Sequence, residues 1–244
     1  MGRRLTAPVL TPLWRAAAAR AVGSSHRERG QPCQDAAEVR RLDDGRVVAA
    51  VADGAGSALR SDEGSAAAVA AAAEAVRDGA DLPGVFEAAC AALGEEPAER
   101  AERATTLLVG VLDDQRLAVG QVGDGFAVIR RNGIYGIVGE VDDREYVNET
   151  VFLSSSSWRD HLRVTTIDAA AVDACALLTD GLQLVAIELA TATPFAGFFD
   201  PLFAWLGSGA DTAPDEELAA FLASPRLAER TDDDVSLALI RRTR

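Results

Sequence analysis

VADGAGS (51–57), QVGDG (121–125), LLTDGL (177–182) and TDDDVSLALI (231–240) each place an aspartate beside an apolar run typical of a β-strand. A carboxylate in such a place is costly to bury unless a partner or a cation compensates its charge. In three of these strings glycine follows the aspartate, and glycine permits sharp turns and close approach of the backbone. Carboxylates at several strand ends are the ligands that a hard divalent cation needs, so the strings predict a metal-dependent enzyme.

The stretches between these strings alternate between strand-like and helix-like patterns. Strands are expected at 46–53, 105–112, 116–122, 126–131, 134–139, 150–153, 162–167, 174–179 and 234–241. Helices are expected at 61–78, from Pro83 to about Leu93, and at 181–190, 195–206 and 214–223, whereas 14–22 fits either a strand or a short helix. Helices before and after a dense block of strands predict an α+β layered sandwich of two sheets with helices outside. The aspartates would then meet at one end of the sandwich.

Length and charge limit the possible functions. The chain has 244 residues, 48% of them hydrophobic, and no break in composition, so one domain over residues 1–244 is expected. Its net charge of −14 and pI near 4.6 argue against a broad nucleic-acid-binding surface and suit a protein that concentrates cations.

The cysteines and the apolar runs suggest where the protein works. Cys33, Cys90 and Cys175 form no CxxC pair, which favours neither a disulfide framework nor a zinc site and suggests a reducing compartment. No apolar run approaches the length of a membrane-spanning helix. A cytoplasmic protein without membrane attachment is therefore expected.

The order and spacing of the motifs resemble the type 2C metal-dependent protein phosphatases, particularly their shorter bacterial members. The resemblance runs from GSSHRERGQPCQDA (23–36) to TDDDVSLALI, nearly the whole chain, and includes the Thr-rich strand ATTLLVGV (104–111). The family has Asp-Asp-Gly, Gly-Asp, Asp-Gly and a terminal Asp-Asn in this order. The matching positions here are Asp35, Asp53-Gly54, Gly123-Asp124, Asp180-Gly181 and Asp233-Asp234. This resemblance implies a four-layer αββα sandwich with two packed antiparallel sheets.

The resemblance also implies a metal centre and its ligands. Two Mn²⁺ or Mg²⁺ ions would activate a water that attacks phosphorus directly, without a phosphoenzyme. Asp53 would bridge the ions, the Gly54 carbonyl would bind one of them, and Asp180 and Asp233 would bind the other. The remaining two motif aspartates have secondary roles: Asp124 would help to hold a third ion, and Asp35 would orient metal-bound water or ligate directly.

The chain departs from the family pattern at several positions. Ala55 replaces a histidine that serves many relatives as general acid, Gln34 replaces an acidic residue, and Asp234 stands where asparagine is common. The phosphate-gripping arginine has no counterpart at its usual place. Nearby candidates for the missing phosphate-binding and acid roles are His26, Arg27 and Arg29, and His26 is the preferred catalytic candidate. Residues 140–161 are short and polar for a substrate-recognition flap.

Together these features predict a monomeric phosphatase that acts on phosphoserine and phosphothreonine in proteins and opposes a bacterial serine/threonine kinase. Two alternatives stay open at this point. A noncatalytic phosphatase-like module that binds a partner or a phosphopeptide would account for Ala55, and a hydrolase of small phosphoesters would account for the short flap.

Overall fold

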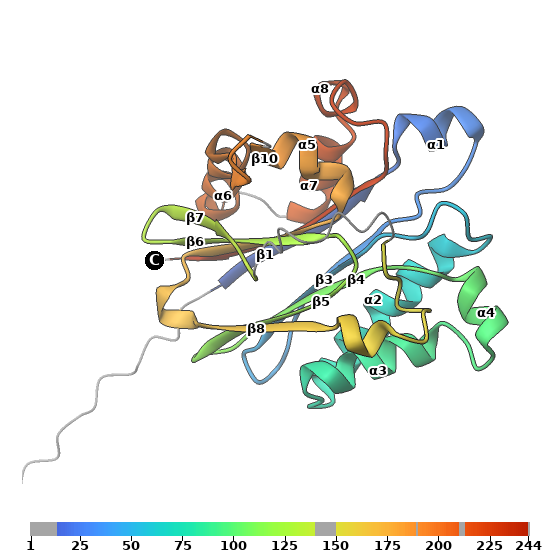
Figure 1. Ribbon diagram of the computed structural model, residues 1–244. Coiled ribbons are helices and arrows are strands. Elements are labelled where there is room, and N and C mark those ends of the chain that lie inside the picture. Colours follow the sequence, from blue (N-terminus) through green and yellow to red (C-terminus); the bar gives the residue numbers. More distant parts are fainter. Residues whose placement is uncertain (1–13, 140–149, 189, 210–212, 244) are drawn as a thin grey trace, which may run out of the picture.

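Two five-stranded antiparallel sheets pack face to face in the computed structural model, and helices cover the outer face of each (Figure 1). The structure describes residues 14–139, 150–188, 190–209 and 213–243. This arrangement confirms the predicted αββα sandwich. Each sheet buries one face against the other sheet and one against helices, as a layered fold requires.

The strand orders show how distant parts of the chain become neighbours. The first sheet has the order β1 (Trp14–Ala21), β12 (Val235–Arg242), β9 (Ala174–Leu178), β6 (Phe126–Arg131) and β7 (Ile134–Ile137). The second has the order β2 (Ala36–Arg41), β3 (Val47–Ala52), β4 (Leu107–Leu112), β5 (Arg116–Val122) and β8 (Arg163–Asp168). In the first sheet, β12 lies between β1 and β9 and so joins the two ends of the described chain.

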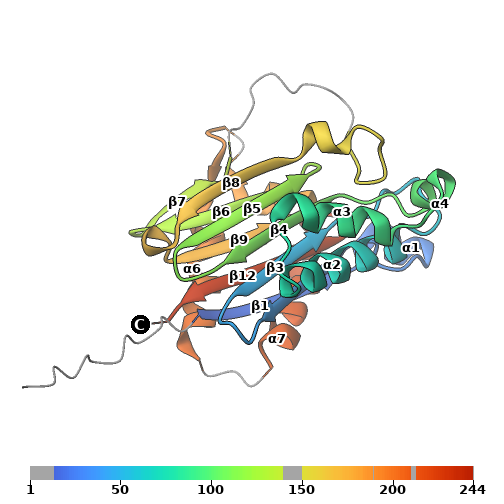
Figure 2. The same ribbon diagram turned by 90° about the horizontal axis from the view of Figure 1, so that it is seen from below.

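The helices fall into two groups, one on each sheet. Those on the second sheet are α2 (Ser61–Arg77) and α3 (Leu82–Ala92), with the short α4 (Pro97–Glu102) nearby (Figure 2). Those on the first sheet are α5 (Gln183–Ala186), α6 (Ala196–Ser208), α7 (Pro214–Leu222) and α8 (Pro225–Ala228) (Figure 1). The short α1 (Ser24–Arg29) follows β1 at the end of the sandwich, and β10 (Ile187–Glu188) pairs with β11 (Thr193–Pro194).

Strand β3 illustrates why the sequence forms this core. All six of its residues are buried, because it lies inside the second sheet with both faces covered. Val48, Ala50 and Ala52 pack towards the layer of α2 and α3, whereas the alternate residues pack against the first sheet. A strand covered on both faces reads as a continuous apolar run, which is the pattern VVAAVA.

Most expected elements are present, with differences at the less regular ones. The ambiguous segment 14–22 forms strand β1, whose pairing with β12 selects the strand over the helix. Residues 150–153 were expected to form a strand, but they do not, and Leu153 is buried with its amide bonded to the Thr105 carbonyl. The expected helix at 181–190 is limited to a 3₁₀ turn and α5, because the chain turns into β10 at Ile187.

Other helices and strands were not expected from the sequence: α1, β2, α4, α8 and the two-residue strand β11. These are short or amphipathic, so they lack a long periodic signal. Of the segment compared with a flap, residues 140–149 lie outside the described part, and Trp158–His161 forms a 3₁₀ turn. The described helices include none with both the length and the apolar character needed to cross a bilayer.

Candidate metal centre

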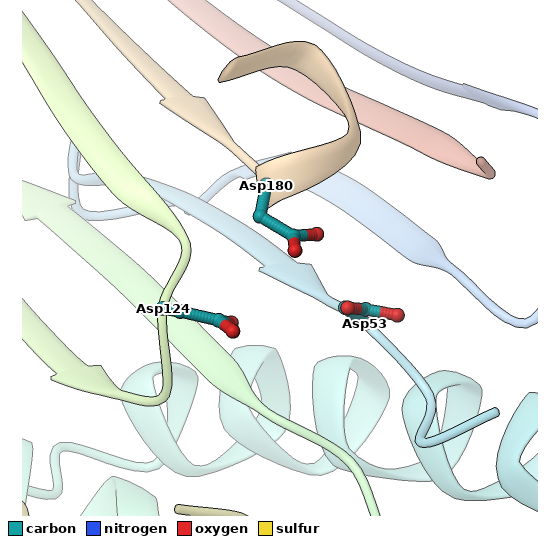
Figure 3. A group of neighbouring side chains, drawn as sticks. All are labelled: Asp53, Asp124 and Asp180. Atoms are coloured by element: carbon teal, nitrogen blue, oxygen red, sulfur yellow. The ribbon is translucent and has the colours of Figure 1, made fainter. Parts of the chain in front are cut away.

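Three aspartates from different strands meet at one end of the sandwich (Figure 3). Asp53 directly follows β3, Asp124 lies in the turn between β5 and β6, and Asp180 follows β9 by two residues. One carboxylate oxygen from each residue lies within 4.8 Å of the others. The fold therefore gathers strings that lie 56 to 127 residues apart into one group of oxygen donors.

Asp53 is central to this group. Its carboxyl lies close enough to those of Asp35 and Asp180 to affect the pKa of both. Burial, followed by the charges of Asp35 and then Asp180, raises the pKa of Asp53 to about 10. Its main chain is fixed by two buried threonines: the Thr105 hydroxyl donates to its carbonyl at 2.9 Å, and its amide donates to the Thr106 hydroxyl at 2.9 Å.

Asp35, whose charge acts on Asp53, is only 1% exposed. The Thr179 hydroxyl donates a 2.7 Å hydrogen bond to Asp35 Oδ2 and accepts one from the Ser236 amide at 2.9 Å. Burial raises the pKa of Asp35 to about 7, although the bond from Thr179 opposes this shift. Thr179, just after β9, thus holds Asp35 directly, and Ser236 of the neighbouring strand β12 holds Thr179 in place.

The other expected ligands lie around Asp53 at different depths. Burial, then the charges of Asp124 and Asp233, raises the pKa of Asp180 to about 6. Asp124 is exposed and accepts a 2.5 Å bond from the Thr150 hydroxyl. Asp233 is not part of the 4.8 Å group, but its charge acts on Asp35, Asp53 and Asp180.

Glycines beside two of these aspartates are required by close packing. A Cβ on Gly54 would lie 2.7 Å from the carbonyl oxygens of both Gln34 and Ser61. A Cβ on Gly181 would lie 2.0 Å from the carbonyl oxygen of Asp234. The Asp-Gly pairs therefore reflect the tight convergence of segments around the carboxylates.

The donor set fits a hard divalent cation. Burial and neighbouring negative charge are the main causes that raise the pKa of Asp53, and no cationic side chain is among its principal influences. Clustered carboxylates of this kind repel one another until protons or a cation compensate them. Oxygen donors that differ in depth and exposure suit Mg²⁺ or Mn²⁺, which retain several waters.

Asp234 holds the chain segment that precedes Asp35. Its buried carboxylate accepts three hydrogen bonds, from the Gly23 amide at 2.7 Å, the Gln34 amide at 2.6 Å and His26 Nδ1 at 2.8 Å. It thereby holds both ends of the 23–34 segment that precedes Asp35. An asparagine has only one acceptor oxygen and cannot replace all of these bonds, which explains this departure from the family pattern.

The expected phosphate-binding residues are placed as follows. His26 is buried in α1, with one ring nitrogen bonded to Asp234. Arg27 and Arg29 are exposed, and each donates to a nearby main-chain carbonyl. Arg20, an exposed residue of β1 that was not singled out in the sequence, hydrogen-bonds to the Asp35 carbonyl.

Sequence reasoning also missed Thr179 and the role of Asp234. Thr179 precedes an Asp-Gly pair and resembles an ordinary strand residue, so no local pattern distinguishes it. Asp234 belongs to a run of three aspartates, in which the sequence cannot show which one faces the core. The only available signal was its departure from the family's asparagine.

Clustered carboxylates at the end of a double antiparallel sandwich are typical of the class of metal-dependent phosphoester hydrolases. The chain belongs to one family of this class: a family model described as "Protein phosphatase 2C" matches residues 22–223. Members of that family are protein phosphatases, so the chain is a hydrolase. This result confirms the resemblance inferred from the motifs.

Individual relatives agree with this assignment. The chain is 31% identical over 248 residues to serine/threonine-protein phosphatase 3 of Escherichia coli K12, covering 93% of this chain and 97% of the relative. The serine/threonine phosphatase Stp1 from Staphylococcus aureus has a similar fold (TM-score 0.65, 13% identity, 99% of this chain and 98% of that one). So does the catalytic domain of the phosphatase PstP, solved with two manganese ions (TM-score 0.64, 20% identity, 95% and 99% covered).

The metal-free centre predicts an unusual dependence of stability on pH. In the folded protein the pKa values of Asp35, Asp53 and Asp180 are about 7, 10 and 6, above the ordinary 3.8. The folded state keeps protons that the unfolded chain releases, so this contribution to stability is complete below about pH 3.8 and is lost as pH rises through these values. In EDTA, the free energy of unfolding by urea should fall by at least about 1.4 kcal/mol between about pH 5 and pH 8.

Saturating Mn²⁺ provides the control for this prediction. A cation stabilises the deprotonated carboxylates, so the fall in the free energy of unfolding with rising pH should disappear or reverse when metal is bound. A metal-free protein whose stability increases across the same pH range would contradict the prediction.

Proposed function

We propose that this protein is a Mn²⁺- or Mg²⁺-dependent phosphatase of phosphoserine and phosphothreonine in proteins, and that it opposes a bacterial serine/threonine kinase. The observation that carries this proposal is the convergence of Asp53, Asp124 and Asp180 at the end of the sandwich. When bound there, the metal ions would supply a strongly activated water and neutralise charge on the phosphate.

The roles of individual residues follow from their positions. Asp53 would bridge two ions, with the Gly54 carbonyl on one and Asp180 and Asp233 on the other. Asp124 would contribute to a third ion at the exposed side. Asp35, held by the Thr179 hydroxyl, would orient the attacking water or accept its proton at Oδ1 or Oδ2.

His26 is the candidate acid for the leaving group. Asp234 holds its Nδ1 at 2.8 Å, which fixes the ring and leaves Nε2 as the nitrogen for a substrate. A proton on Nε2 would pass to the serine or threonine oxygen as the phosphorus–oxygen bond breaks. The same nitrogen, when protonated, would also attract phosphate.

An assay of metal dependence tests the proposed function. The purified protein is stripped with EDTA and assayed against p-nitrophenyl phosphate and a set of phosphopeptides, before and after Mn²⁺ or Mg²⁺ is restored. We expect turnover only with metal and a preference for the peptides. Turnover of small phosphoesters alone would indicate the small-molecule hydrolase. No turnover with any metal, together with binding to a phosphoprotein, would indicate the noncatalytic module.

The role of His26 gives a prediction of its own. His26→Ala should lower kcat/KM about 10²-fold at saturating Mn²⁺, with unchanged metal affinity, because a general acid or phosphate contact is lost. His161, the second of the chain's two histidines, is exposed and bonds to the Ser157 carbonyl, so His161→Ala is the matched control.

A second variant separates catalysis from positioning at His26. In His26→Asn the amide can still donate to Asp234, but no acid remains at the position of Nε2. We expect this variant to stay as slow as His26→Ala. Recovery of wild-type kcat/KM and of the wild-type pH profile would instead assign the role to Arg27, Arg29 or the metal centre alone.

The cellular context is also part of the proposal. The absence of a CxxC pair and the acidic composition favour a protein that works in the cytoplasm, on phosphoproteins and not on nucleic acid. We propose that a monomer is the active form. Each ligand in the proposed centre comes from one chain, so catalysis requires no second copy.

A further inference from the structure

A groove of about 720 Å³ lies among α5, α6, α7 and α8, the helices that cover the first sheet. Aromatic side chains line it, among them Phe198, Trp205 and Phe221. Leu184 and Phe195 also line the groove and remain 64% and 45% exposed. The size and the apolar lining are those of sites that bind small organic molecules, and side chains this apolar are seldom left exposed together without a function.

Positive charge is present on one wall of the groove. Arg226 and Arg230, four residues apart at α8 and just after it, line the groove and are exposed. Neither guanidinium has an ion-pair partner among the residues that the structure describes. Two unpaired cations are notable in a chain with a net charge of −14.

The acidic residues of the groove already have hydrogen-bond partners. Glu217 accepts a bond from the Trp205 indole at 2.9 Å. Glu188 accepts one from the Thr191 hydroxyl at 3.4 Å. Neither carboxylate forms an ion pair with Arg226 or Arg230 among the described residues, so both guanidinium groups are available to an anion beside the apolar surface.

We propose that this groove binds an amphipathic anion, a small molecule with an apolar chain or ring system and a carboxylate. The apolar part would lie against Phe198, Trp205 and Phe221, and the carboxylate would bind Arg226 and Arg230. Guanidinium groups match carboxylates well because they donate parallel hydrogen bonds.

The groove is also connected to the metal centre through the chain. Asp180 begins the 3₁₀ turn that leads directly into α5, one wall of the groove. Arg230 at another wall is three residues before Asp233. A ligand that shifts these walls would move two proposed metal ligands, so binding in the groove regulates metal affinity. This step rests on the proposed function.

Binding is tested first, without any assay of activity. Titration calorimetry with dodecanoate, below its micelle-forming range, should show one site per chain, whereas dodecyltrimethylammonium, with the same chain and the opposite charge, should not bind. R226Q/R230Q should weaken dodecanoate binding at least about 10-fold, the loss expected for charge-assisted hydrogen bonds. R116Q/R131Q, which removes two exposed arginines outside the groove, should leave it unchanged.

A surface variant tests the apolar part of the site. Phe221 is 37% exposed, so the F221A variant should fold normally. Its affinity for dodecanoate should nevertheless be lower than that of the wild type. Three results would overturn the proposal: no binding of dodecanoate, equal binding of the cation, or full affinity in R226Q/R230Q. A dimer that F221A disrupts would likewise overturn it, because a second copy would then occupy the groove.

The coupling has a separate measurement. The Mn²⁺ dissociation constant, also from calorimetry, should change about 5-fold or more when dodecanoate is present, and dodecanoate affinity should change by the same factor with Mn²⁺. R226Q/R230Q should abolish this change. An unchanged Mn²⁺ affinity would refute the coupling, whereas failure of the protein to bind Mn²⁺ at all would refute the proposed function and leave the dodecanoate result intact.

Discussion

Asp53→Ala is expected to abolish binding of the paired metal ions and to reduce kcat by at least about 10³-fold at saturating Mn²⁺. The reason is its central position, since its carboxyl lies with those of Asp124 and Asp180 and affects the pKa of Asp35 and Asp180. Without metal, the variant should be at least as stable as the wild type in urea, because repulsion among the clustered carboxylates is relieved. Calorimetry with Mn²⁺, steady-state kinetics and unfolding in EDTA measure the three effects.

Two comparisons make this prediction specific. Asp180→Ala and Asp233→Ala should lose comparable activity, because ligands of one centre act as a unit. Asp114→Ala removes an exposed carboxylate in the turn before β5 and should change neither activity nor Mn²⁺ affinity. Substantial activity of Asp53→Ala at saturating Mn²⁺ would refute its assignment as the bridging ligand.

Asp234→Ala should have the largest effect on stability, a loss of about 3 to 5 kcal/mol in the free energy of unfolding. The substitution leaves the amides of Gly23 and Gln34 and the His26 ring without their buried acceptor. Freed at both ends, the segment before Asp35 would no longer place that carboxylate beside Asp53. We therefore expect weaker Mn²⁺ binding as well, measured in conditions where the variant is folded.

Asp232 provides the matched control because it lies only two residues away and is acidic and exposed. Asp232→Ala removes the same charge from the same run of aspartates, and it should change stability by no more than about 0.5 kcal/mol. Asp234→Asn keeps one acceptor oxygen and should lie between the wild type and the alanine variant. An Asp234→Ala protein as stable as Asp232→Ala would show that the three hydrogen bonds contribute little.

The layered fold could be predicted because its buried strands have strong local signals. β3 and β9 are continuous apolar runs that end near an aspartate, and both were recognised. β2 was missed because AAEVRR, a strand at the edge of its sheet, mixes charged and apolar residues without a strict alternation. The segment 150–153 looks like a strand from its apolar residues, but Leu153 instead fills the core beside β4.

The candidate site was predictable only in part. Its aspartates are recognisable from their order along the chain, and the structure brings Asp53, Asp124 and Asp180 together as expected. The residues that position these aspartates were not predictable. Thr179 and Asp234 act through hydrogen bonds between segments that are distant in sequence. Such contacts depend on strand register, which single-sequence patterns do not specify.

The place of β12 between β1 and β9 has a consequence for synthesis on the ribosome. Until residues 235–242 have emerged, β1 has no partner strand, and the first sheet is divided into two parts. Asp233, Asp234 and Ser236 arrive with this strand, so the supports of Asp35 are completed only then. A nascent chain that stops earlier lacks both the Asp234 carboxylate that accepts from the Gln34 amide and the Ser236 amide that donates to Thr179, so the contacts that position Asp35 are complete only after β12 has been synthesised.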